Sequence, residues 1–405
     1  MMPPSRRSEP IDVSALNKSD LIVGIDFGTS YTSVGLVVGN KVRLLSDAAG
    51  DKMFPSVISL PVRGGARVIG RAARDMLATD PTRTVASPKR LLGRRFDEQE
   101  VMTFLRQAPY KSGPGPDGSP VIEIWGEPYS VTQLCSYLFT HARELAEQAL
   151  GVPVRRAVIA VPVTFDDARV RAATRAAQLA GLEVVAVIDE PTAAALANRY
   201  VPGFGGIIGV YDFGGGTFDF SLVDVSRSVF QVLTTAGDTW LGGDDLDQVL
   251  AEAAANQFWR LHKVDLRRQA VEWQRLLFAC EQAKRELSTA DLATIHVPEV
   301  LRTADGMVDL KLAIDRATLA RASASLIERT LRVCDSALAK VGLAPKHLSA
   351  VYLCGGTTYM PAVQSAVSRH FGIELRTGIA PDQAVCLGAA IHASMVASGR
   401  AVVGA

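Results

Sequence analysis

The sequence lacks the features that mark several common classes of protein. No uncharged apolar run approaches the roughly 18 to 20 residues that a membrane-spanning helix needs, so we expect no membrane partner. Lysine and arginine together number 43 against 42 acidic residues, and this balance argues against a surface that binds nucleic acid. Arg6 and Arg7 have no apolar segment after them, which is typical of a flexible tail rather than a targeting signal.

Cysteine is scarce, and the usual phosphate-loop motif is missing. The five cysteines are scattered without a Cys-x-x-Cys pair, and an odd number cannot all pair within one chain. We therefore expect a reduced, cytoplasmic protein. The sequence contains no Gly-x-x-x-x-Gly-Lys-Ser/Thr segment, and the Gly-x-Gly-x-x-Gly match at 113–118 is broken by prolines. Any phosphate site must therefore be of a different type.

Two glycine-rich segments, one in each half of the chain, are the most informative feature present. In 207–223 an apolar run ends in Asp212, three glycines follow, and an alternating apolar strand leads away. The pattern predicts a hairpin whose bare backbone can approach an anion closely. The segment 22–37 repeats it, with Asp26 in the place of Asp212. Either hairpin alone fits an ordinary tight turn, but together they favour a duplicated fold whose halves face each other across a phosphate.

Between the hairpins, strands and helices alternate. We expect a helix from the capping box at Ser130, a strand over 157–161, a helix capped by Thr164 and a strand over 183–188. This order predicts a mainly parallel sheet flanked by helices. Ligands of such sheets bind beyond the strand ends, where Glu190 falls.

The length of 405 residues favours at least two domains. The glycine-rich stretch 202–206 is the best hinge between them, since it precedes the second hairpin. We expect a flexible tail over 1–20, lobe I over 21–203 with a peripheral subdomain at about 57–130, lobe II over 204–376 with a peripheral subdomain at about 242–312, and a C-terminal helix over 377–405 that returns to lobe I.

The predicted cleft between the lobes combines acidic residues with phosphate-binding loops. A carboxylate about 4 Å from a phosphate charge costs on the order of 4 kcal/mol at an effective dielectric constant near 20. A divalent cation must therefore lie between them, and Mg²⁺ fits because it keeps most of its waters. The acidic residues are Asp26, Glu190, Asp212 and Asp219, and hydroxyls that can donate to phosphate oxygens are at Thr29, Ser30 and Thr217.

A series of segments, in order, resembles the nucleotide-binding domain of the heat-shock 70-kDa chaperone family. The hairpins alone would indicate only the wider actin, hexokinase and chaperone superfamily, whereas Glu190-Pro-Thr-Ala-Ala-Ala and 281–288 make the match specific. The resemblance implies an α/β, actin-like ATPase fold with two duplicated lobes, each with a mixed, mainly parallel sheet, and ATP or ADP in the cleft. The matching segments are 25–31, 89–94, 160–165, 188–195, 212–219, 236–245, 280–288 and 355–358.

The resemblance also implies roles for individual residues. Lys89 would orient the attacking water, and Thr217 would contact the γ-phosphate. Without the resemblance, Lys89 would be interpreted as an ordinary surface charge. Asp26, Glu190 and Asp212 would organise Mg²⁺, mostly through water. Asp219 would join Asp26 and Asp212 in holding K⁺, and Pro162 and Arg169 resemble an interdomain switch. The nucleotide-binding residues would be Gly28, Thr29, Ser30, Tyr31, Gly214, Gly215, Gly216, Gly242, Gly243, Glu281, Lys284, Arg285, Ser288, Gly355, Gly356, Thr357, Tyr359 and Asp382.

Three departures from the family pattern alter these expectations. Tyr359 stands where the family usually has an arginine that stacks on adenine, and an aromatic ring can stack as well. Ala186 replaces the arginine that the family's J-domain partners contact, and Asp189 replaces an asparagine nearby, which argues against a conventional J-domain partner. Little sequence follows Ser398, so we expect the peptide-binding domain to be absent.

These observations favour a Mg²⁺-dependent ATPase that hydrolyses ATP slowly and switches the conformation of its lobes. Besides the nucleotide, its partner would be a nucleotide-exchange factor or another protein client. One alternative is a nucleotide-gated regulatory protein with little turnover. Another is an actin-like filament ATPase or a sugar kinase, although no sugar-site signature is apparent.

Overall fold

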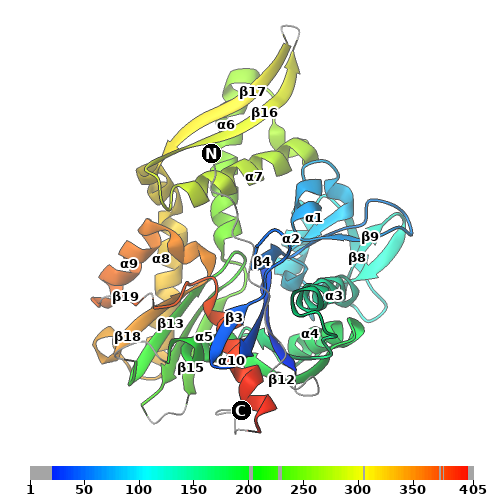
Figure 1. Ribbon diagram of the computed structural model, residues 1–405. Coiled ribbons are helices and arrows are strands. Elements are labelled where there is room, and N and C mark those ends of the chain that lie inside the picture. The colour runs from blue at the N-terminus through cyan, green and yellow to red at the C-terminus, as the bar shows by residue number, and fades with distance from the viewer. Residues whose placement is uncertain are drawn as a thin grey trace.

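The computed structural model describes residues 21–199, 204–226, 230–303, 306–373, 375–376 and 378–399. Within them, two large β-sheets form the centres of two parts that lie side by side in Figure 1. We call the parts built around the first and second sheet lobe I and lobe II. The predicted tail over 1–20 and residues 202–203 of the predicted hinge lie outside the described residues, so the exact lobe boundary stays a prediction.

The sheet of lobe I has the order β12-β11-β1-β2-β3. Its central strand β1 is buried, pairs antiparallel with β2, and pairs parallel with β11. Helix α3 packs on both α4 and β2. The elements are β1 (Ile22–Phe27), β2 (Tyr31–Val38), β3 (Lys41–Leu44), β4 (Met53–Pro55), α3 (Val131–Leu150), β11 (Arg156–Val161), α4 (Asp167–Leu179), β12 (Glu183–Asp189) and α5 (Glu190–Asn198).

Lobe II repeats this arrangement in a sheet of the order β15-β14-β13-β18-β19. Strand β13 pairs antiparallel with β14 and parallel with β18, as β1 does with β2 and β11. The duplication predicted from the two hairpins is therefore confirmed at the level of strand order. The elements are β13 (Ile207–Phe213), β14 (Phe218–Asp224), β15 (Gln231–Asp238), α8 (Arg316–Lys340), β18 (Ala350–Cys354), α9 (Pro361–Phe371) and β19 (Leu375–Arg376).

Smaller units extend from both lobes, and the pair β16 and β17 forms the ribbon at the top of Figure 1. In lobe I they are β5 (Val57–Ser59), β6 (Val68–Ile69), α1 (Arg71–Met76), β7 (Thr84–Ala86), the 3₁₀ turn η3 (Pro88–Arg90), α2 (Gln99–Gln107), β8 (Lys111–Pro114), β9 (Pro120–Ile124) and β10 (Glu127–Ser130). In lobe II they are α6 (Gly243–His262), α7 (Ala270–Glu286), β16 (Leu292–Thr303) and β17 (Gly306–Asp315).

The last helix, α10 (Ala384–Ala397), packs against α5, β1 and β2 of lobe I. Its approach to these elements is close because small residues face each other. A Cβ atom on Gly388 would lie 1.8 Å from the carbonyl oxygen of Ala193 in α5. Glycine is therefore required where α10 crosses α5.

Both helices predicted from capping patterns are present, but only one of the two predicted caps is correct. Helix α3 begins after Ser130, whose hydroxyl accepts a hydrogen bond from the Gln133 amide at 3.1 Å, as predicted. The cap predicted at Thr164 is wrong, because Asp166 caps α4 by accepting from the Arg169 amide at 2.9 Å. The Thr164 hydroxyl instead donates to Asp219 of lobe II, at 3.2 Å.

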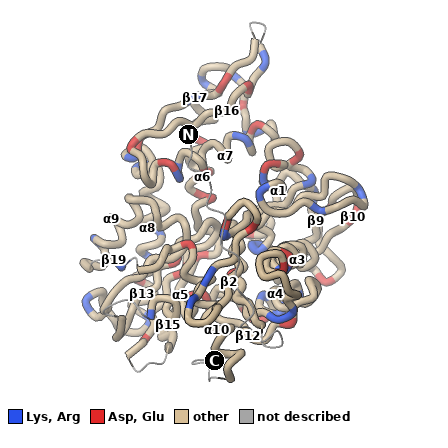
Figure 2. Tube along the Cα trace, in the orientation of Figure 1, with Lys and Arg blue, Asp and Glu red and all other residues tan. Residues whose placement is uncertain are grey.

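Charged residues of both signs are spread over both lobes, as Figure 2 shows. This agrees with the nearly equal numbers of basic and acidic residues. In the described ranges, every helix is too short or too polar to cross a membrane.

Candidate functional site

Two hairpin tips, one from each lobe, contact each other. The first joins β1 to β2 and contains Thr29 and Ser30, and the second joins β13 to β14 and contains Gly215 and Gly216. A Cβ atom on Gly215 would lie 2.1 Å from Ser30 Oγ, and one on Gly216 would lie 2.4 Å from Thr29 Cγ2. Side chains cannot fit at those distances, so the second tip meets lobe I as bare backbone.

Hydrogen bonds fix the conformation of both tips. The Ser56 hydroxyl donates to the Gly28 carbonyl at 2.9 Å, and the Ser56 amide donates to the Ser30 carbonyl at 2.8 Å. In the second tip, the Gly214 amide donates to the Thr217 carbonyl at 3.0 Å. Each tip is therefore held by its own lobe before any ligand binds.

The N-terminal end of α6 ties the second tip to the first. The amides of Gly243 and Asp244 donate to the carbonyls of Gly214 and Gly215, at 3.0 and 2.8 Å. The Ser30 hydroxyl of lobe I donates to the Asp244 carboxylate at 3.3 Å. A Cβ atom on Gly242 would lie 2.2 Å from the Gly215 carbonyl oxygen, so this position also requires glycine.

Two predicted nucleotide-binding residues from distant elements reach the second tip or the start of α6 that holds it. The Thr357 hydroxyl donates to the Gly214 carbonyl at 2.8 Å. Lys284 of α7 donates to the Gly243 carbonyl and to the Asp247 carboxylate, each at 2.7 Å. Lys284 therefore helps to hold the start of α6, and its predicted contact with adenosine stays a prediction.

The predicted acidic residues gather around a single buried lysine. Lys89 Nζ lies 2.9 Å from Glu190 Oε1, and the Lys89 side chain is 3 % exposed. Burial and the charge of Glu190 raise the pKa of Asp26 to about 7, against the opposing effect of Lys89. The same causes raise the pKa of Asp219 to about 7. Burial, Glu190 and both other aspartates raise the pKa of Asp212.

This cluster fits a bound cation. Buried carboxylates repel one another, and their raised pKa values mean that the fold alone does not compensate their charge. In the part of the chain that the structure describes, no group of three or more His, Cys, Asp or Glu side chains is arranged to ligate a metal directly. Carboxylates that bind the waters of Mg²⁺ need no such direct cage.

The cluster leads to a testable pH dependence of stability. In the unfolded chain the pKa of these carboxyls is about 3.9, whereas in the folded protein the pKa of Asp26 and that of Asp219 are both about 7. Between these values the folded protein binds more protons than the unfolded chain, so the free energy of unfolding must fall as the pH rises. We expect the nucleotide-free protein to melt at a higher temperature near pH 5.5 than near pH 7.5. The first pH lies below the folded pKa of about 7, and the second lies above it.

Variants separate this effect from other titrations. Asp26→Asn and Asp219→Asn should each flatten the dependence of melting temperature on pH. Asp167→Asn should leave it unchanged, since the Asp167 side chain is 96 % exposed. A wild-type melting temperature that rises between these pH values, with no difference in Asp26→Asn, would contradict the assignment.

A second group of residues joins the lobes at their periphery. Arg74 of α1 forms an ion pair with Glu281 of α7. Arg74 also donates to the Tyr31 hydroxyl at 2.7 Å, and Arg285 donates to the same hydroxyl at 3.0 Å. Tyr31, Glu281 and Arg285 were all predicted to bind the nucleotide, whereas Arg74 was not predicted. The structure brings these side chains into one bridge between the lobes.

If nucleotide binds in the predicted cleft, removing Arg74 from this bridge should speed its release. Arg74→Ala deletes an ion pair whose side chains are 24 % and 21 % exposed. We expect the dissociation rate of ADP to rise roughly fivefold, corresponding to about 1 kcal/mol. The matched control is Arg71→Ala in the same helix, since Arg71 pairs with Asp51 within lobe I. Equal rates for Arg74→Ala and wild type in low salt, measured by stopped-flow with a fluorescent nucleotide, would show that the bridge does not retain nucleotide.

The remaining predicted residues lie in three places. The Tyr359 hydroxyl donates to Asp382 at 2.9 Å, so these two form a pair after β18. Gly355 lies against the end of β13, since a Cβ atom there would be 2.4 Å from the Phe213 carbonyl oxygen. Gly356 is exposed at the start of the same turn, and Ser288 follows the end of α7.

The predicted switch residues lie beside the segment that carries Lys89. Arg169 is buried and donates to the carbonyls of Lys89 and Leu92, each at 3.2 Å. Its guanidinium carbon lies 3.8 Å from the centre of the Phe165 ring. Pro162 is buried at the end of β11, and its carbonyl accepts from the Phe165 amide at 3.0 Å. Arg169 therefore borders the Lys89 segment directly, and Pro162 contacts Phe165, on whose ring Arg169 packs.

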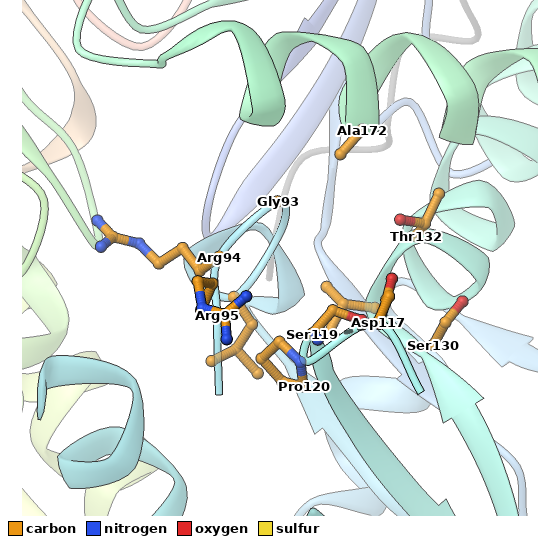
Figure 3. A pocket seen from close by; sticks show the side chains of 11 residues that line it. Gly93, Arg94, Arg95, Asp117, Ser119, Pro120, Ser130, Thr132 and Ala172 are labelled. Carbon is orange, nitrogen blue, oxygen red and sulfur yellow. Dashed lines mark hydrogen bonds between the residues drawn. The ribbon is translucent and has the colours of Figure 1, made fainter. Parts of the chain in front are cut away.

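A polar cavity of about 350 Å³ lies elsewhere in lobe I. It is drawn in Figure 3, where Asp117 lies between Ser119 and Ser130, below Thr132 and Ala172. Its lining contains none of the predicted site residues. It therefore contributes nothing to the interpretation of the hairpin tips.

Comparisons with known proteins agree with the resemblance in the sequence. The family model described as Hsp70 protein matches residues 22–404. The heat shock 70 kDa protein, mitochondrial, of Solanum tuberosum is 37 % identical over 375 residues, which cover 93 % of this chain and 55 % of that protein. The chain thus spans about half the length of this relative.

Proposed function

The chain belongs to the Hsp70 family, and on that premise we propose that it binds ATP between its two lobes and hydrolyses it slowly. The observation that carries the proposal is the contact between the two hairpin tips beside the Lys89–Glu190 ion pair. Bare backbone amides suit phosphate oxygens, and the buried lysine supplies a fixed positive charge. In this proposal, the lobes change conformation as ATP is bound and hydrolysed.

The side chains act mainly by positioning and by electrostatics. Lys89 donates a hydrogen bond to the attacking water and is itself oriented by Glu190. The Thr217 hydroxyl donates to the terminal phosphate, while the backbones of both tips hold the phosphate chain. Phosphoryl transfer needs these effects more than it needs covalent catalysis, because the reacting groups must be aligned and their charge compensated.

Metal ions and the nucleoside complete the proposed site. Asp26, Glu190 and Asp212 hold the waters of Mg²⁺, and Asp219 helps to bind K⁺. Mg²⁺ neutralises phosphate charge when it is bound. The adenosine is held on one side by Glu281, Lys284, Arg285 and Ser288, and on the other by Gly355, Gly356, Thr357, Tyr359 and Asp382.

The proposed partners follow from the family. A nucleotide-exchange factor or another protein client would respond to the state of the lobes. Ala186 and Asp189 argue against a conventional J-domain partner. The cytoplasmic location stays a proposal, because the Solanum tuberosum relative is named as mitochondrial.

Phosphate release from Mg-ATP by the purified protein tests the proposal. We expect slow release by wild type and a loss of roughly a hundredfold in Glu190→Gln, which leaves Lys89 without its buried partner. Glu328→Gln is the matched control, since the Glu328 side chain is 70 % exposed. An unchanged rate in Glu190→Gln would reject the assignment. Tight ATP binding by wild type without phosphate release would favour a regulatory protein with little turnover.

A further inference from the structure

One aromatic side chain of lobe II packs in lobe I. Trp240 lies between β15 and α6, yet it packs against the apolar core of lobe I. Its ring centre is 5.6 Å from that of Phe104 in α2. The contact joins the lobes close to the hairpin tips, and nothing in the proposed function above uses it.

Two arginines of lobe I complete the surroundings of the indole. The guanidinium carbons of Arg90 and Arg94 lie 5.5 and 5.6 Å from the Trp240 ring centre, within the range of cation–π attraction. Arg94 also donates to the Thr239 hydroxyl at 2.8 Å. In Figure 3 the Arg94 side chain points away from the other labelled residues, in keeping with this contact. Lobe I thus contacts Trp240 with one aromatic ring and two cations.

Arg90 connects this contact to the phosphate site. Its side chain is 5 % exposed, and Nη2 lies 3.7 and 3.6 Å from the carboxylates of Asp244 and Asp245 at the start of α6. A Cβ atom on Gly216 would lie 2.9 Å from Arg90 Nε, so the guanidinium packs on the second tip. Arg90 directly follows Lys89 in η3.

The segment that carries Trp240 is held by lobe II on both sides. The Trp240 amide donates to the Asp238 carboxylate at 3.1 Å, and Asp238 forms an ion pair with Arg329 of α8. After Trp240, Gly242 packs on the carbonyl of Gly215. A displacement of the indole from lobe I would therefore move the second tip away from Arg90 and Lys89.

We propose that Trp240 is a positioning residue, which sets the distance between Lys89 and the second hairpin tip by packing in lobe I when the lobes close on nucleotide. The inference rests on the proposed function, since it concerns the same phosphate site. The packing leaves the buried Trp240 Nε1 without a hydrogen-bond partner among the described residues, which costs free energy in the closed state. In the open state water can satisfy this group, which favours release.

The first test compares variants of the tryptophan. Trp240→Ala should raise the dissociation rate of ADP by about tenfold or more and lower kcat, because it removes a ring pair and two cation–π contacts. Trp240→Phe keeps an apolar ring and should recover most of the wild-type rate. Trp259→Ala is the matched control, since Trp259 is 47 % exposed on α6. A release rate for Trp240→Ala equal to that of Trp259→Ala would overturn the proposal.

A double-mutant cycle distinguishes positioning from a general loss of stability. Phe104→Ala should speed ADP release much as Trp240→Ala does, and the double variant should add little to either change. Independent effects would instead multiply. Multiplied rates, with each variant melting at the wild-type temperature, would also overturn the proposal.

Two further measurements do not depend on turnover. The protein has four tryptophans, and replacing Trp125, Trp259 and Trp273 by phenylalanine leaves Trp240 as the fluorescent probe. Mg-ADP should reduce acrylamide quenching of that probe, and unchanged quenching in a protein that binds Mg-ADP would contradict the proposal. With saturating Mg-ADP, X-ray scattering should give a larger radius of gyration for Trp240→Ala than for wild type. If wild type binds no nucleotide, the proposed function fails, whereas equal radii in two proteins that both bind Mg-ADP overturn the Trp240 inference alone.

Discussion

Lys89→Ala is expected to lower the rate of ATP hydrolysis by about 10² to 10³-fold, the usual effect of removing one fixed electrostatic donor from an active site. The Lys89 ammonium is buried and paired with Glu190 at 2.9 Å, so its position is set before substrate binds. Affinity for ADP should change much less, because the two hairpin tips remain. Single-turnover hydrolysis of Mg-ATP, together with equilibrium binding of ADP, measures both quantities.

The matched control for this variant is Lys111→Ala. Lys111 belongs to β8, and its side chain is 84 % exposed. It should hydrolyse ATP at the wild-type rate. If Lys89→Ala also turned over at that rate, Lys89 would have no part in the chemistry. If it lost ADP affinity and hydrolysis equally, Lys89 would act in binding alone.

Gly215→Val is expected to raise the dissociation constant for ATP by at least about a hundredfold, equivalent to about 2.7 kcal/mol. The first carbon of the new side chain would lie 2.1 Å from Ser30 Oγ and 2.7 Å from Ser30 Cβ. Because such distances are impossible, the two tips must separate, and the phosphates would lose one of the two backbones that hold them. Isothermal titration with Mg-ATP measures the change.

Gly113→Val provides the comparison for the glycine variant. A Cβ atom on Gly113 meets no described atom within 4 Å, and the residue lies in β8. Its ATP affinity and melting temperature should equal those of wild type. Wild-type affinity in Gly215→Val would mean that the contact between the tips has no role in binding phosphate.

The fold could be predicted because its signals are local in the sequence. Asp26 and Asp212 each end a strand before a glycine turn, and the strands around both have the same pairing. The expectation of an α/β, actin-like ATPase fold with two duplicated lobes is confirmed by this strand order and by membership of the Hsp70 family.

The contacts between the lobes could not be predicted in this way. Arg74 and Glu281 are 207 positions apart, and Arg285 and Tyr31 are 254 apart, so no pattern within a window of sequence joins them. The wrong cap at Thr164 has the same origin. Its hydroxyl bonds Asp219, which is 55 positions away, while the neighbouring Asp166 caps the helix.

For some side chains, the sequence predicts the correct region of the fold but not the contacts that they make there. Lys284 was expected to reach the nucleotide, whereas its ammonium donates to Asp247 and to the Gly243 carbonyl. Arg90 and Trp240 lie inside segments that carry the family resemblance, yet neither has a sequence signal of its own. Their roles depend on the packing of one lobe on the other, which only the three-dimensional structure contains.

A crystal structure of the protein grown with Mg²⁺ and ADP tests the central claim most directly. The account predicts electron density for the diphosphate against the backbones of both tips, Gly28–Tyr31 from lobe I and Gly214–Thr217 from lobe II, with a metal ion between the phosphates and Asp26 or Asp212. Density for the nucleotide that touches only one lobe, or that lies in the cavity lined by Arg95 and Thr132, would contradict it.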